Sequence, residues 1–158
     1  NRFYGVAAAR KVVIIGFAVG VGCSLIGTQI HGEFGPLVTL RIAIGSGLAF
    51  LTAQLIDVQI FDRLREGSWW RAPLTSTLIG STVDTAIFFT IAFSALFNGV
   101  EPGNMPTWAQ DGVPLLGAGP VVPLWVSLAV ADWGVKLSLA MIALIPFRVI
   151  TGNKAVAT

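Results

Sequence analysis

Cysteine, histidine and charged side chains are all scarce in this chain, and each scarcity excludes a class of function. It has one cysteine, Cys23, and one histidine, His31, so it can form neither an internal disulfide framework nor a cysteine- or histidine-rich metal site. A G-x-x-x-x-G-K-[ST] phosphate loop, an H-E-x-x-H zinc motif and a G-x-S-x-G nucleophile elbow are also missing. The sequence therefore predicts no enzyme, no metal site and no resident cofactor.

Apolar residues are instead in excess. Of the 158 residues, 54% are hydrophobic and 11% are charged, and the mean hydropathy is +0.79, so lipid must surround much of the chain. A membrane crossing needs roughly 20 apolar residues, and four runs are long enough. They cover approximately residues 6–30, 37–61, 73–97 and 121–147. The sequence predicts one all-α integral membrane domain over residues 1–158, with four transmembrane helices in the lipid bilayer.

The positions of Lys and Arg predict the orientation of these spans. Three regions at span ends carry Lys or Arg: the chain start (Arg2, Arg10, Lys11), the second connection (Arg63, Arg65, Arg71) and the chain end (Arg148, Lys154). The connections at 31–36 and 98–120 have none. Because positive charge is disfavoured on the translocated side, we expect both ends of this chain to be cytoplasmic. The basic residues are too dispersed for a nucleic-acid partner.

Several polar side chains fall inside the predicted spans. An ionised group at mid-bilayer costs several kcal/mol or more, so each should face protein, water or ligand. At 1.5 Å per residue, Asp84 and Lys136 each lie about 16 Å from the cytoplasmic end of their span, which is near mid-membrane. Asp132 and Lys136 are four residues apart and share a helix face. The pattern favours a binding site between helices, with candidates Asp84, Asp132, Lys136, Asp57, Gln54, Ser81 and Arg41.

Structural roles are the alternatives for these residues. An Asp84–Lys136 pair can simply fix helix register, although buried ion pairs stabilise poorly. Asp57 can anchor the following loop through Arg63 or Arg65, and Arg41 can extend to the lipid headgroups. Ser and Thr side chains such as Ser81 often join helices. The small-residue strip Gly16, Gly20 and Cys23 predicts close helix contact, either within the chain or in a homo-oligomer.

Continuous motifs over about forty residues give a more specific signal. They are Ala53-Gln-Leu-Ile-Asp-Val58, Ile60-Phe-Asp-Arg-Leu-Arg65, Trp69-Trp-Arg-Ala-Pro73, Ser76-Thr-Leu-Ile-Gly80 and Val83-Asp-Thr85, followed by Phe88-Phe89 and Ile91-Ala-Phe93. With these motifs the sequence resembles the queuosine precursor transporter family, bacterial inner-membrane proteins grouped with vitamin uptake transporters. Residues 1–5 resemble the tail of a motif that follows an earlier span. The resemblance implies an N-terminally truncated chain and six spans in the full-length protein, packed as one bundle.

The substrates implied by this resemblance are 7-deazaguanine bases, the nitrile preQ0 and the aminomethyl preQ1. A carboxylate can accept two N–H bonds from the guanine-like edge, an amide can complement other polar atoms, and aromatic rings can stack on the base. We therefore expect Asp84 to accept the base edge, Lys136 and Asp132 to tune it, and Asp57 with Gln54 to form a second contact. A cationic aminomethyl group would also suit an aspartate.

Three other functions stay open on the sequence alone. One is a substrate-binding membrane subunit of an energy-coupled vitamin importer, which would need a partner ATPase. Another is a membrane scaffold without transport. The third, an intramembrane hydrolase with Asp84 and Asp132 as a dyad, is disfavoured because Lys136 would keep both carboxylates ionised.

Overall fold

Four long helices form the chain, as the sequence predicts. The computed structural model describes residues 5–33, 35–64, 66 and 68–152, with side chains in the last helix described as far as Pro146. Its long helices are α1 (Gly5–Gln29), α2 (Leu40–Leu64), α3 (Arg71–Phe93) and α4 (Leu124–Gly152). All four are long and apolar enough to cross a membrane. Residues 1–4 of the N-terminal motif, Arg65, the Arg148 side chain and Lys154 lie outside this description.

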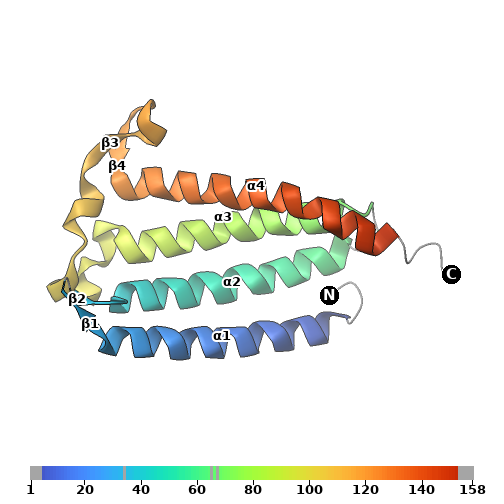
Figure 1. The fold of residues 1–158 in the computed structure, drawn as a ribbon, viewed down its shortest axis with the longest axis horizontal. Coiled ribbons are helices and arrows are strands. Elements are labelled where there is room, and N and C mark those ends of the chain that lie inside the picture. Colours follow the sequence, from blue (N-terminus) through green and yellow to red (C-terminus); the bar gives the residue numbers. More distant parts are fainter. Residues whose placement is uncertain (1–4, 34, 65, 67, 153–158) are drawn as a thin grey trace.

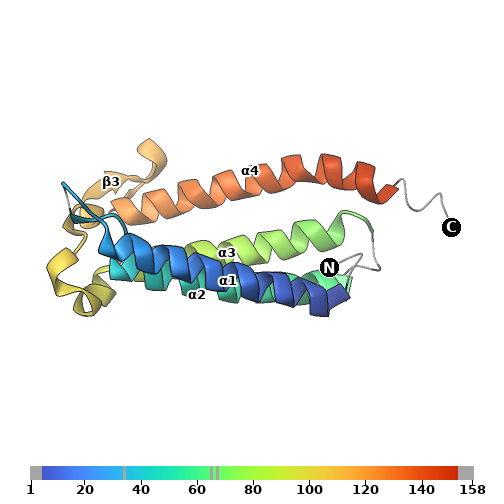
Figure 2. The same cartoon turned by 60° about the horizontal axis from the view of Figure 1, so that its bottom comes forward.

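The helices run alternately up and down, and each packs mainly against its sequence neighbour (Figure 1). The α2–α3 pair has the most extensive contact; α1 rests on α2, and α4 rests on α3. Figure 2 shows α1 and α4 on different sides of the central pair. Arg10, Lys11, Arg63 and Arg71 all belong to the end at which α1 begins and α2 passes to α3. The two connections without Lys or Arg lie at the opposite end. These basic residues therefore gather at one end of the four helices, as the sequence pattern predicts.

Glycines allow the central helices to approach closely. A Cβ placed on Gly45 of α2 would lie 3.3 Å from the carbonyl oxygen of Phe88 and 3.5 Å from the backbone nitrogen of Ala92. Both neighbours belong to the α3 backbone and cannot turn aside as a flexible side chain can. On α1, a Cβ placed on Gly16 would lie 3.5 Å from the ring of Phe50 on α2, so this part of the predicted small-residue strip makes contact within the chain. Cys23 is exposed.

Substituting Gly45 with valine should therefore separate α2 from α3. Overpacking a tight contact costs about 1–3 kcal/mol, so we expect a lower unfolding temperature in detergent. Gly20→Val is the matched control, because a Cβ at Gly20 of α1 would meet nothing within 4 Å and the intrinsic helix cost is the same. Equal unfolding temperatures for the two variants would contradict the close approach.

The connections contain short elements that the hydropathy pattern did not predict. A hairpin of β1 (His31–Gly32) and β2 (Gly35–Pro36) links α1 to α2. Between α3 and α4 lie η1 (Ala95–Val100), η2 (Pro102–Asn104), η3 (Thr107–Gln110) and η4 (Leu115–Gly117), with a second hairpin of β3 (Gly112–Pro114) and β4 (Val121–Pro123). The prediction that the third span reaches residue 97 is wrong. Ser94 adopts an extended conformation, and its hydroxyl accepts the N–H of Leu96.

Large apolar side chains remain exposed along α1 and α4. Ile15 on α1 is 63% exposed and Ile142 on α4 is 62% exposed, and many of their neighbours are similar. Isolated exposed apolar residues are ordinary, but contiguous apolar helix faces require lipid or another helix. This surface agrees with a protein whose outer solvent is the bilayer.

Candidate functional site

Lys136 of α4 holds the site together by contacting two carboxylates. Its Nζ lies 2.7 Å from Oδ2 of Asp84 on α3 and also donates to Oδ2 of Asp132, one turn earlier on α4. The predicted meeting of the two polar spans is thus confirmed. So is the predicted pairing of Asp132 with Lys136 along one helix face. All three side chains are about one-third exposed without lipid present.

Thr85 completes this network. Its Oγ1 donates to Asp132 Oδ2 at 2.8 Å and accepts from Lys136 Nζ at 3.1 Å. The arrangement satisfies the lysine with three acceptors and keeps two carboxylates near a single cation. A second link from α4 to α3 lies nearby, where Trp133 Nε1 donates to Thr82 Oγ1 at 2.9 Å. The network therefore fixes the register of α4 on α3 and carries a formal charge of −1 when its groups are ionised.

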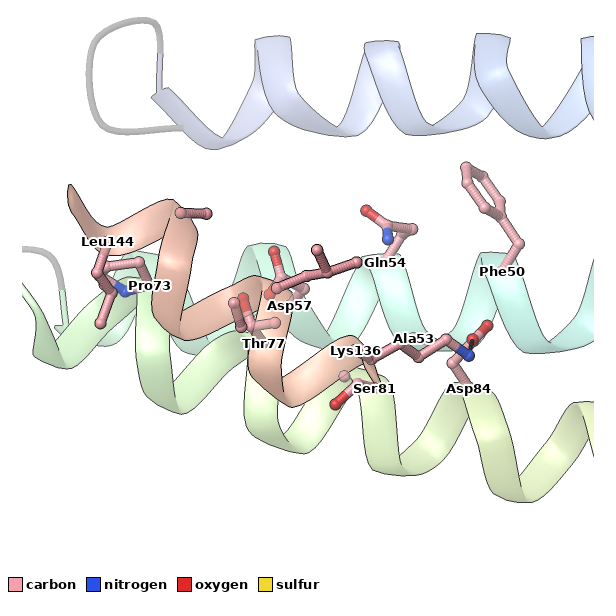
Figure 3. Close-up of a pocket in the computed structure, with 14 residues that line it drawn as sticks. Phe50, Ala53, Gln54, Asp57, Pro73, Thr77, Ser81, Asp84, Lys136 and Leu144 are labelled. Carbon is pink, nitrogen blue, oxygen red and sulfur yellow. Dashed lines mark hydrogen bonds and ion pairs between the residues drawn. The ribbon is translucent and has the colours of Figure 1, made fainter. Parts of the chain in front are cut away.

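A cavity of about 590 Å³ opens beside this network, between α2, α3 and α4. Asp84 and Lys136 lie at one part of its wall, and Gln54, Asp57, Thr77 and Ser81 add further polar groups (Figure 3). The remaining wall is apolar and comes from Phe50, Ala53, Pro73, Gly80, Leu139, Ala140, Ala143 and Leu144. A mostly apolar pocket of a few hundred Å³ with a few convergent polar groups is typical of a small-molecule site.

Five of the seven predicted site residues line this cavity: Gln54, Asp57, Ser81, Asp84 and Lys136. Asp132 does not line it but contacts Lys136. The sequence also allows Asp57 to anchor the following loop through Arg63 or Arg65. The described ion pairs contain no Asp57–Arg63 pair, the Asp57 side chain lines the cavity, and Arg65 is outside the described residues. The structure gathers these residues, while their contact with a ligand stays a prediction.

Arg41 is the residue that the structure places elsewhere. Its side chain is fully buried, at 0% exposure, and its guanidinium donates to the carbonyl oxygens of Ile91 and Ser94 and to Asn98 Oδ1. The two carbonyls lie at the C-terminal end of α3, where carbonyls lack helical partners, and Asn98 lies in η1, which follows. Arg41 therefore neither lines the cavity nor extends toward headgroups, because its donors are used to tie α2 to the end of α3.

Sequence analysis did not identify some residues whose roles depend on contacts that only the fold creates. Glu101 accepts the backbone N–H of Arg41 at 3.2 Å and a bond from Asn104 at 2.7 Å, so it fastens the long connection to α2. Neither Glu101 nor Asn98 lies in an apolar run, and no motif identifies them. Thr85 could have been found, because it directly follows Asp84 on the helix that faces Lys136.

Comparison with known proteins decides the family. The family described as "Putative vitamin uptake transporter" matches residues 1–151. The chain belongs to the vitamin uptake transporter family. This confirms the sequence resemblance, and a family of transporters agrees with the prediction of a chain that is not an enzyme.

Curated relatives of this family member carry a more specific name. A "Probable queuosine precursor transporter" of Haemophilus influenzae is 34% identical over 122 residues, which are 70% of this chain and 51% of the relative. The "Queuosine precursor transporter" of Escherichia coli is 38% identical over 106 residues, 58% of this chain and 47% of the relative. The chain spans about half the length of the curated relatives it matches. No solved structure matches.

Proposed function

We propose that this chain forms the substrate pathway of an inner-membrane carrier that imports queuosine precursors, the 7-deazaguanine bases preQ0 and preQ1. The observation that carries the proposal is the cavity between α2, α3 and α4 with the Asp84–Lys136 pair in its wall. Ionic groups at the level of lipid tails are costly, and a pathway for a polar ligand explains their presence. The names of the relatives supply the class of ligand.

A guanine-like base matches the chemistry of the cavity wall. One oxygen of Asp84 is held by Lys136, which leaves the other oxygen to accept an N–H from the base edge. Gln54 offers both a donor and an acceptor, and the ring of Phe50 offers a face for stacking. Asp132 takes part indirectly, because it shares Lys136 with Asp84.

The proposal includes the orientation. The helix ends that carry Arg10, Lys11, Arg63 and Arg71 would face the cytoplasm, since translocation disfavours positive charge. The cavity lining runs from Asp84 to Pro73, which lies near this basic end of α3, so a ligand there would leave toward the cytoplasm. The full-length form under this proposal is a six-span bundle.

The test is rescue of a bacterial strain that cannot make the precursor. With low external preQ0 or preQ1, queuosine should appear in its tRNA only when the full-length protein is present. We expect Asp84→Asn to reduce initial uptake at least about tenfold, because a charge-assisted hydrogen bond is worth about 1.5–3 kcal/mol. Glu66→Gln, at an exposed site, is the control.

Failure of the wild-type protein to rescue would remove the proposed function. Rescue with unchanged uptake by Asp84→Asn would keep the function but remove this residue from the binding site.

A further inference from the structure

Asp57 is the second carboxylate of the cavity, and its surroundings differ from those of Asp84. It projects from α2 beside Gln54, which lies three residues earlier on the same helix, and both line the cavity (Figure 3). Asp57 lies beside Gly80 of α3, where an added Cβ would be in ordinary van der Waals contact with it, 3.6 Å from the Asp57 Cβ. The carboxylate is therefore seated against α3, about 13 Å along that helix from its start at Arg71.

Asp57 has no cationic partner among the described residues. The cation in the cavity wall is Lys136, whose ammonium is already held by Asp84, Asp132 and Thr85. The described ion pairs contain no lysine or arginine bound to Asp57. A carboxylate at the level of a membrane span without a counter-ion is costly, so the site is suited to receive a positive charge from elsewhere.

The site as a whole, like Asp57 alone, carries a net negative charge. Asp84 and Asp132 contact the Lys136 ammonium, and Asp57 lines the same cavity without contacting it, so these four groups carry a formal charge of −2 when all are ionised. With low-dielectric walls, such a site attracts a cationic ligand more than a neutral one of the same shape.

The two carboxylates are also separated along the cavity. Gly80, which touches Asp57, and Asp84 are four residues apart on α3, so the two groups reach the cavity about 6 Å apart along the helix axis. A bicyclic base held by its polar edge at Asp84 can thus direct a substituent on its other ring toward Asp57.

We propose that Asp57 is a subsite for a cationic amino group on the transported base, and that it makes the carrier favour the aminomethyl base over the nitrile base. This inference rests on the proposed function and adds a charge preference to it. The ligand then spans the cavity, with its neutral hydrogen-bonding edge at the Asp84–Lys136 pair and its ammonium at Asp57.

The experiment measures uptake of preQ1 and preQ0 separately by the full-length protein and by its Asp57→Asn variant. We expect the asparagine to raise KM for preQ1 at least about tenfold, as loss of a charge-assisted contact does, and to change KM for preQ0 less than about threefold. Asp57→Glu keeps the charge and should retain the preference for preQ1. Asp111→Asn makes the same chemical change at an exposed position and should alter neither KM.

Each outcome bears on the inference. If Asp57→Asn is present in the membrane at the normal level and loses uptake of preQ1 and preQ0 equally, Asp57 is not a subsite for the cationic group. The proposed carrier function would still stand. Unchanged kinetics for both substrates would lead to the same conclusion. If Asp57→Asn fails to accumulate in the membrane, the KM values of the wild-type protein test the inference instead. A wild-type KM for preQ1 that is no lower than its KM for preQ0 overturns the proposed preference. A wild type that transports neither base overturns the proposed function as well.

Discussion

Replacing Lys136 with methionine is expected to abolish uptake and to lower the free energy of unfolding by about 3 kcal/mol. The ammonium donates to Asp84, Asp132 and Thr85, so its loss leaves two carboxylates near each other without a cation. Removing one partner of a buried ion pair costs about 3–5 kcal/mol, and the partial exposure of this network places the expected value at the lower end. Thermal unfolding in detergent and initial uptake rates measure the two effects.

A double variant separates the charge effect from the loss of packing. Adding Asp84→Asn to Lys136→Met removes one of the two unpaired carboxylates and should recover part of the stability without recovering uptake. Such coupling is what a double-mutant cycle reports for residues in contact. Additive losses would show that the pair seen in the structure has little energetic weight.

Arg41→Ala is expected to destabilise the protein by about 3–5 kcal/mol, mostly at the end of the helices opposite the basic residues. Its guanidinium satisfies the carbonyls of Ile91 and Ser94 and the side chain of Asn98, and a buried acceptor left without a donor costs about 1–3 kcal/mol. The connection that begins at Ser94 should become more accessible to protease, which is a local readout of the lost contacts.

Arg41→Lys is the informative companion variant. Lysine keeps the charge but lacks the planar fork that reaches several acceptors at once, so it should restore only part of the stability. Arg10→Ala removes a cation from an exposed position on α1 and should leave stability unchanged. If Arg41→Ala unfolds at the wild-type temperature, the tie between α2 and α3 has no stabilising role.

Much of the architecture follows from hydropathy and charge alone. Four apolar runs gave the four helices, because nothing but a hydrogen-bonded helix or a closed barrel satisfies the backbone in lipid. The pairing of Asp84 with Lys136 can also be predicted, because the two residues lie at the same depth on different spans and carry opposite charges. The third span was predicted to end too late, because Leu96 and Phe97 are apolar although Ser94 has already ended the helix.

The role of Arg41 shows what hydropathy could not provide. Its depth near a span end predicted either a ligand contact or an extended side chain, whereas its acceptors are backbone carbonyls and a loop amide brought close by the fold. The cavity, like the contacts of Arg41, depends on how the helices pack and cannot be read from hydropathy. The sequence shows Asp57 and Gln54 as polar residues in a span, but only the placement of α4 along α3 shows that both line one cavity with Lys136.

Ligand protection of an introduced thiol tests most directly whether this cavity is the binding site. In full-length protein with Cys23 replaced by alanine, Thr77→Cys places a thiol in the cavity wall, and Ser68→Cys places one at an exposed position outside it. Labelling by a water-soluble maleimide is followed with and without preQ1. A bound base should slow labelling at position 77 severalfold and leave position 68 unaffected; equal labelling at position 77 with and without the base, in a variant that still transports it, would contradict the account.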